Sequence, residues 1–244
     1  GEIMSSGLSF ICGSVQFGRL GGVNRRICRK GKLCRSVVMS SGLGSDVGKL
    51  FVARCLDNPV GFVAVRRNNR ESHLGWLMST DRVLLAGPLI REKTTVGSLV
   101  LLKGESLEEV QTLLLEDPYR QAGLFESVKV TGWRQVYTTS FYSEDLYVVY
   151  NLDNEGMSEV RAANRAAHLA WWNASGREGI VGPLLDEDGN SIGSLLVFER
   201  EGVGMEEVKS WSLTDPYNQA ELFQESEVYL SHKVIVDGAR VRAS

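Results

Sequence analysis

The sequence is poor in the residues that build disulfide frameworks and metal centres. Its 244 residues include only four cysteines and three histidines. Cys12, Cys28 and Cys34 lie in a basic N-terminal stretch, and Cys55 lies in an apolar run, so the folded part contains no cysteine pair. No C-x-x-C spacing offers a thiolate zinc site either. We therefore expect neither a disulfide scaffold nor a bound metal.

Long apolar runs and nucleotide-binding motifs are missing as well. No uninterrupted apolar stretch approaches the roughly 20 residues that a membrane-spanning helix needs, so we expect no membrane partner. The patterns G-x-G-x-x-G, G-x-x-x-x-G-K-[ST] and H-E-x-x-H do not occur. The sequence thus predicts no cofactor.

Charge is distributed unevenly along the chain. Residues 1–45 hold seven Lys and Arg but one acid, Glu2, whereas the whole chain has a net charge of −3. The acidic remainder argues against a nucleic-acid partner, which needs a basic surface to displace counterions. A basic, Ser- and Gly-rich, acid-poor start is typical of an organelle transit peptide. We predict a plastid transit peptide or disordered leader at 1–47, with a mitochondrial address or a basic tail without address as alternatives.

What the chain does contain is an internal repeat. Arg-x-x-His-Leu occurs at residues 70–74 and 165–169, and a Gly-Pro pair follows 14 residues after each His. A nine-residue block that starts with Asp-Pro-Tyr occurs at 117–125 and 215–223, with seven identical positions. The chain is therefore a duplication of one domain, and we predict the copies at 48–137 and 145–236, with a C-terminal tail at 237–244.

Each copy shows the element order β-α-β-β-α-β, which is the ferredoxin-like order. The first strands, near residues 49–56 and 146–150, are apolar on both faces, as in a sheet covered on both sides. Both helices of a ferredoxin-like unit cover one face only, so a second sheet must cover the other. The sequence predicts an α+β protein in which two ferredoxin-like domains pack sheet to sheet as an intramolecular pseudo-dimeric α/β barrel.

Four motifs in order, complete in the first copy and repeated with small departures in the second, resemble the YCII-related (YciI-like) domain family of the dimeric α/β-barrel superfamily. They are Arg-x-x-His-Leu-x-Trp-Leu, Gly-Pro-Leu, Gly-Ser-Leu and Asp-Pro-Tyr-x-x-Ala-Gly-x-Phe. The resemblance implies a His–Asp pair in a pocket as a general acid/base site. Carried over by motif, the pairs are His73 with Asp117 and His168 with Asp215. The second copy departs from the pattern at Glu221, where the first has Gly123, a change that can alter or close one pocket.

Each candidate residue also has a purely structural interpretation. Asp before Pro predicts a helix N-cap with Pro at the first helical position, although a carboxylate can cap with one oxygen and hold His with the other. Arg70 and Arg165, three residues before each His, either bind an acidic substrate group or lie on a solvated helix surface. Tyr119 and Tyr217 either donate a hydrogen bond in the pocket or pack in the first helical turn. His232 is expected at the surface of the last strand.

Our hypothesis is a small-molecule pocket for cofactor-independent acid/base chemistry of the isomerase, lyase or dehalogenase type. Its substrate would be a small organic acid or lactone, on which His and Asp transfer a proton. The alternative is a non-catalytic module that binds a metabolite or a protein. A third reading is a structural duplicate with filled pockets. The pseudo-dimer can in addition pair into a homo-oligomer.

Overall fold

The computed structural model describes residues 24–27, 33–36, 49–139 and 142–241. Most of the expected leader, and with it the question of a transit peptide, lies outside the described residues. The two described segments within it, β1 (Asn24–Ile27) and β2 (Leu33–Ser36), pair antiparallel. We call residues 49–139 the first half and residues 142–241 the second half.

Both halves contain the predicted β-α-β-β-α-β order, with a short extra helix before the last long strand. The first half consists of β3 (Lys49–Asp57), α1 (Phe62–Ser79), β4 (Val83–Arg91), β5 (Thr94–Gly104), α2 (Leu107–Leu113), the 3-10 helix η1 (Leu114–Glu116), α3 (Pro118–Gln121), β6 (Phe125–Trp133) and β7 (Tyr137–Thr138). The second half consists of β8 (Asp145–Asp153), α4 (Ser158–Ser175), β9 (Gly179–Leu185), β10 (Ser191–Glu199), α5 (Met205–Ser212), α6 (Pro216–Gln219), β11 (Phe223–His232), β12 (Ile235–Val236) and β13 (Ala239–Arg240). Part of the expected tail thus folds, because β13 pairs with β12 and β12 with β4.

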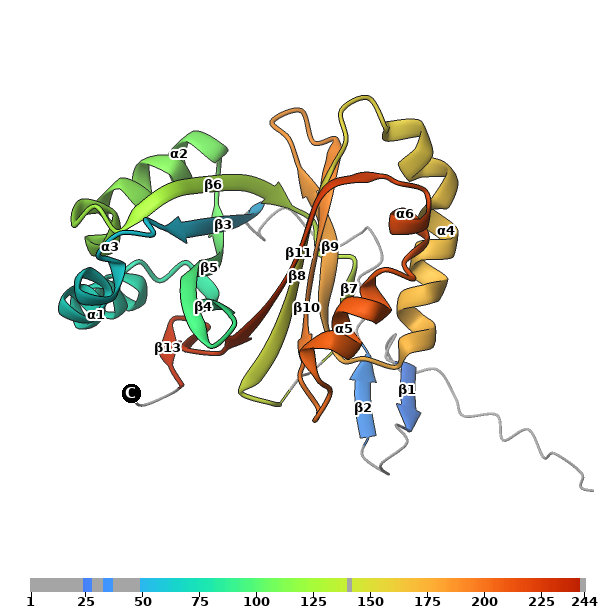
Figure 1. Cartoon of the computed structure of the whole chain (residues 1–244), viewed down its shortest axis with the longest axis horizontal. Coiled ribbons are helices and arrows are strands. Elements are labelled where there is room, and N and C mark those ends of the chain that lie inside the picture. The colour runs from blue at the N-terminus through green and yellow to red at the C-terminus, as the bar shows by residue number, and fades with distance from the viewer. Residues whose placement is uncertain (1–23, 28–32, 37–48, 140–141, 242–244) are drawn as a thin grey trace, which may run out of the picture.

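The strands of the two halves form one closed barrel. Within the halves the strand orders are β6-β3-β5-β4 and β11-β8-β10-β9, and all neighbours are antiparallel. The ring closes where β6 pairs with β9 and β4 pairs with β11. The helices of the first half lie on one side of this barrel and those of the second half on the other (Figure 1). This arrangement confirms the predicted intramolecular α/β barrel.

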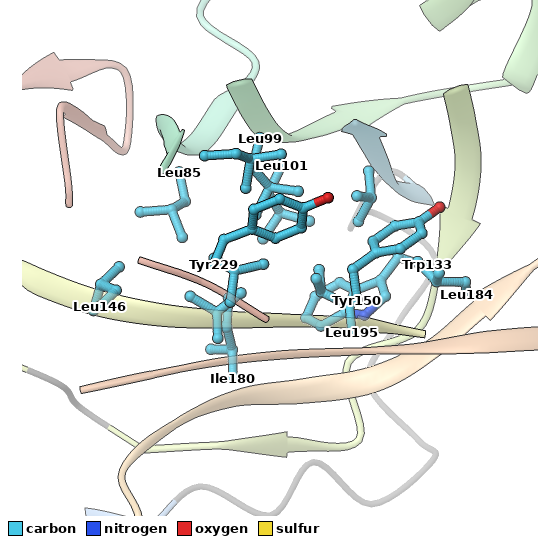
Figure 2. Packing of buried hydrophobic residues seen from close by; sticks show 14 of the residues in the cluster. Leu85, Leu99, Leu101, Trp133, Leu146, Tyr150, Ile180, Leu184, Leu195 and Tyr229 are labelled. Carbon is cyan, nitrogen blue, oxygen red and sulfur yellow. The ribbon is translucent and has the colours of Figure 1, made fainter. Parts of the chain in front are cut away.

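The core has three apolar layers, as the two-faced strands predicted. Alternate side chains of β3 point to opposite faces, so Val52 enters the barrel while Phe51 and Ala53 pack under the helices of the first half. Val148 of β8 likewise enters the barrel, and its neighbours pack under the helices of the second half. Figure 2 shows the barrel interior, in which leucines of both halves surround Tyr150 and Tyr229. Neither sheet could bury its inner face alone.

One charged side chain interrupts this barrel interior. Arg54 of β3 is buried, forms an ion pair with Glu225 of β11 and stacks over the ring of Tyr150 at 4.2 Å. The buried hydroxyl of Tyr150 has no hydrogen-bond partner among the described residues. Burial raises the pKa of Tyr150 to about 12, because the phenolate would lose its hydration. The phenol is therefore neutral at physiological pH.

Asp57 and Asp153, which end β3 and β8, do not cap the helices that follow them. Helix α1 begins only at Phe62, after Gly61, and α4 begins at Ser158. Neither helix has a side-chain cap. Several turn residues separate each Asp from its helix, so the carboxylate lies beside the second turn instead of at the N-terminus. It is therefore free to bind a side chain of the helix.

Candidate functional site

In each half, a long helix presents three polar side chains on its inner face. In α1 these are Arg66, Arg70 and His73, which are four and three residues apart and so share one stripe of the helix. In α4 the same stripe carries Arg161, Arg165 and His168. Both stripes face cavities in the fold, so the predicted His and Arg residues lie together in each half.

The predicted His–Asp pairs form in both halves. His73 Nδ1 lies 2.7 Å from Asp117 Oδ1, and His168 Nδ1 lies 2.8 Å from Asp215 Oδ1. Both histidines are 5% exposed and both aspartates 2% exposed. In this buried environment each pair is a stable, well-defined contact.

The same aspartates are also the predicted helix caps. Asp117 precedes α3 and accepts a hydrogen bond from the Tyr119 backbone N–H at 2.9 Å. Asp215 caps α6 in the same way, through the Tyr217 backbone N–H at 3.0 Å. We expected one oxygen to cap and the other to hold His, but Oδ1 accepts both bonds. The cap therefore fixes the very oxygen that orients the imidazole.

This geometry sets the tautomer of each neutral histidine. A carboxylate can only accept, so Nδ1 must carry the proton that is shared with Asp. The lone pair of the neutral ring then lies on Nε2. In both halves the His ring lines a cavity.

Each histidine ring lies against a tyrosine ring. His73 stacks on Tyr119 with ring centres 3.9 Å apart, and His168 stacks on Tyr217 at 4.2 Å. Burial raises the pKa of both phenols, so they remain protonated near neutral pH. Packing is thus one role of these tyrosines, and both also line the cavities.

Sequence reasoning missed an ion pair that supports this stack in both halves. Arg66 binds both carboxylate oxygens of Asp57, at 2.9 and 2.7 Å, and its guanidinium lies 4.8 Å from the Tyr119 ring centre. It also donates to Ser98 Oγ at 3.3 Å. The second half repeats this network with Asp153, Arg161, Ser194 and Tyr217. The signal in the sequence was an Arg seven residues before each His, together with the repeated Gly-Ser-Leu motif.

The two cavities differ greatly in volume. The first-half cavity, beside His73, measures about 390 Å³, whereas the second-half cavity, beside His168, measures about 60 Å³. Leu77, Ala86 and Val100 line the first-half cavity, and the corresponding second-half residues are larger. They are Trp172, which has the same spacing from His168 as Leu77 has from His73, and Val181 and Leu196, which follow from the strand registers.

Glu221 is not the cause of this difference. It is exposed, lines neither cavity, and adopts the left-handed backbone of its counterpart, with φ of 52° against 68° at Gly123. The substitution at this position therefore does not close the smaller cavity.

Each cavity receives part of its wall from the opposite half. His232 and Val234, at and just beyond the end of β11, line the first-half cavity. Arg134 and Val136, which follow β6, line the second-half cavity. His232 is thus half-buried beside a cavity, and our expectation of a surface position was wrong. Barrel closure is the reason, since it carries the end of each last strand across to the other half.

Within the described ranges, no group of three or more His, Cys, Asp or Glu side chains could hold a metal ion. Cys55 is buried, and burial raises the pKa of its thiol well above its usual value. No helix among the described residues is both long and apolar enough to cross a membrane.

Comparison with solved structures supports the barrel fold. A chlorite dismutase mutant from Candidatus Nitrospira defluvii covers 79% of this chain and 94% of its own, at 10% identity and a TM-score of 0.53. A heme-binding protein from Thermus thermophilus covers 77% and 92%, at 10% identity and a TM-score of 0.47. At such identity, the first likeness shows the fold alone.

A third solved structure is similar to part of the chain. It is 5-chloro-2-hydroxyhydroquinone dehydrochlorinase from Burkholderia phenoliruptrix AC1100, in complex with 2,5-dihydroxybenzoquinone. It is 30% identical, covers 35% of this chain and 93% of its own, and has a TM-score of 0.33. A search of curated protein sequences gives no significant match.

A family model gives the relationship directly. The model described as the YCII-related domain matches residues 50–134 and, a second time, residues 146–231. The two matches fall on the two halves of the barrel and together cover well over half of the chain. The chain therefore belongs to the YCII-related domain family and carries two copies of its domain.

Proposed function

We propose that the first-half cavity is the active site of a cofactor-independent enzyme that transfers a proton on a small organic acid or lactone. The observation that carries this proposal is the His73–Asp117 pair at 2.7 Å, buried beside a cavity of about 390 Å³. That volume lies within the roughly 300–1,000 Å³ usual for small-molecule sites.

His73 would act through Nε2, the ring nitrogen that Asp117 leaves unprotonated. Nε2 removes a proton from carbon or oxygen of the substrate, and the imidazolium so formed is stabilised by the Asp117 carboxylate. Return of that proton to another atom gives an isomerisation. Loss of a leaving group from the carbanion gives an elimination, as in a lyase or a dehalogenase, and His73 then passes its proton to the leaving group or to water.

The other walls suggest the kind of substrate. Leu74, Leu77 and Leu99 offer an apolar surface suited to the body of a ring or a short chain. Arg70 lines the same cavity, and its ion pair with Glu71 is largely exposed and therefore weak. Arg70 can exchange that partner for a substrate carboxylate or enolate. Arg66 is held by Asp57 and orients the Tyr119 ring instead.

Deuterium exchange tests this proposal without knowledge of the product. Small acids and lactones with an acidic C–H are incubated with the full chain in D₂O, and loss of the proton signal is followed by NMR. We expect the protein to accelerate exchange of at least one compound. His73→Gln should lower that rate by about 10²- to 10⁴-fold, the usual contribution of a general base.

The duplication supplies a matched control. His168→Gln removes the corresponding histidine of the small cavity, so the exchange rate should remain within about twofold of that of the unmodified protein. Equal losses from both substitutions, or exchange that survives His73→Gln, would contradict the assignment to the first half. Tight binding of a compound without exchange would favour the alternative, a metabolite-binding module.

A further inference from the structure

We propose that the second-half cavity is a binding site for a small oxyanion, the size of inorganic phosphate or a carboxylate of one to three carbons. The proposal does not depend on the function proposed for the first half. It rests on the volume of the second-half cavity, on arginines that lack ion-pair partners among the described residues, and on hydroxyl donors in its wall.

The cavity is too small for the substrate that fits the first half. Its volume of about 60 Å³ is several times the roughly 10–15 Å³ that one water molecule needs. Trp172, Val181 and Leu196 are buried and stand where the first half has the smaller Leu77, Ala86 and Val100. Trp172 also packs against Phe198 and Trp211, so its indole is held on more than one side. A compact ligand fits this cavity, whereas an aromatic ring does not.

Three arginines line the cavity, and no Asp or Glu among the described residues does. Arg134, Arg161 and Arg165 line it, and of these only Arg161 forms an ion pair within the described ranges, with Asp153. Among the described residues, no carboxylate pairs with Arg134 or Arg165.

The first half differs in the ion pairing of the corresponding arginine. There Arg70 has Glu71 as an ion-pair partner, but the residue after Arg165 is Ala166. At the first-half cavity, the position that corresponds to Arg134 is occupied by His232, as the strand registers show. Compared with the first-half cavity, the second-half cavity therefore has one neighbouring acid fewer and one Arg more, and both differences favour an anion.

Hydroxyl and imidazole groups complete the wall. Ser194 is buried, and its Oγ accepts a hydrogen bond from Arg161 at 3.1 Å. Because that bond uses a lone pair, the hydroxyl proton of Ser194 remains available to an acceptor in the cavity. Ser191 lies on the same wall. Guanidinium forks and hydroxyls together match the planar or tetrahedral array of acceptors on a small oxyanion.

Calorimetric titration of the full chain with inorganic phosphate, oxalate and benzoate tests the site. We expect phosphate or oxalate to bind and benzoate not to bind there, because benzoate exceeds the cavity. Comparison of phosphate with oxalate shows which source of oxyanion the site prefers. Arg134→Gln and Arg165→Gln should each weaken binding by at least about 10-fold, the effect of a lost charge-assisted bond.

Arg67→Gln is the matched control, since it removes the same charge from an exposed position of α1 that lines neither cavity. Oxyanion affinity should stay within about twofold in this variant. Two results would overturn the proposal: no binding of either oxyanion at about 10 mM, or equal losses in Arg67→Gln and Arg165→Gln. Neither result bears on exchange catalysed by His73, so the two proposals fail separately.

Discussion

A single oxygen of Asp117 accepts two hydrogen bonds, and this geometry predicts different losses of stability for the Asn and Ala substitutions. Oδ1 accepts from His73 Nδ1 at 2.7 Å and from the Tyr119 backbone N–H at 2.9 Å. Asp117→Asn keeps a carbonyl oxygen with two lone pairs, so both bonds can persist without the charge. Charge-assisted hydrogen bonds are about twice as strong as neutral ones, so we expect a loss of about 1–2 kcal/mol in the free energy of unfolding.

Asp117→Ala removes the acceptor and should cost much more. The imidazole N–H and the backbone N–H both stay buried, and each unsatisfied donor costs about 1–3 kcal/mol. We therefore expect a loss of about 2–6 kcal/mol, at or above the upper end of about 2 kcal/mol for loss of an N-cap alone. For a chain of this size, each kcal/mol shifts Tm by about 2–4 °C, so the Ala variant should melt about 10 °C lower.

Urea unfolding and calorimetry measure the two stabilities, and deuterium exchange measures the function. We expect Asp117→Asn to fold nearly as well as the unmodified protein but to lose exchange by at least about 10-fold, because no negative charge then stabilises the imidazolium. Equal destabilisation by Asn and Ala would refute the single-oxygen argument. Full exchange in the Asn variant would show that the charge has no catalytic role. Asp215→Asn and Asp215→Ala should repeat the stability pattern without affecting exchange.

Three other predictions concern buried side chains. Tyr150→Phe should raise the free energy of unfolding by about 1 kcal/mol, because it removes an unpartnered buried hydroxyl, whereas Tyr147→Phe should lower it by a similar amount through loss of the 2.7 Å bond to Val203 O. The free energy of unfolding should fall between pH 10 and about 12. Burial raises the pKa of Tyr150 to about 12, so this phenol loses its proton at lower pH in the unfolded chain than in the folded one. Urea unfolding should show a shallower fall in Tyr150→Phe. Trp172→Leu should cost about 2–4 kcal/mol and admit benzoate to the second-half cavity, as calorimetry would show.

The fold was predictable because its signals are local and occur twice. Strands that are apolar on both faces, such as β3, require a second layer on the face that the helices leave open. The second copy of the repeat supplies that layer. The His–Asp pairs were found for the same reason, since His73 and Asp117 stand in motifs that return at fixed spacing. The helix N-caps at Asp117 and Asp215 were predictable from the Asp-Pro pair alone, because this pair is a short-range signal.

The ion pair between Asp57 and Arg66 escaped sequence analysis because neither residue lies in one of the repeated motifs. Nine residues separate this pair, but eight separate Asp153 from Arg161, and the one-residue difference hides the repeat. The contribution of each half to the cavity wall of the other half could not be predicted for another reason. The position of His232 depends on how the barrel closes, and neither copy of the repeat contains that information by itself.

The exchange of wall segments between the halves has a consequence for how this protein can evolve. In a barrel assembled from two identical subunits, any substitution appears in both cavities at once. Here the two copies are joined in one chain, so selection can act on Leu77 and Trp172 separately. A substitution after β11 changes the cavity of the first half, while one after β6 changes that of the second half. Two copies in one chain thus make the two cavities independently variable, and protein engineers can vary them one at a time.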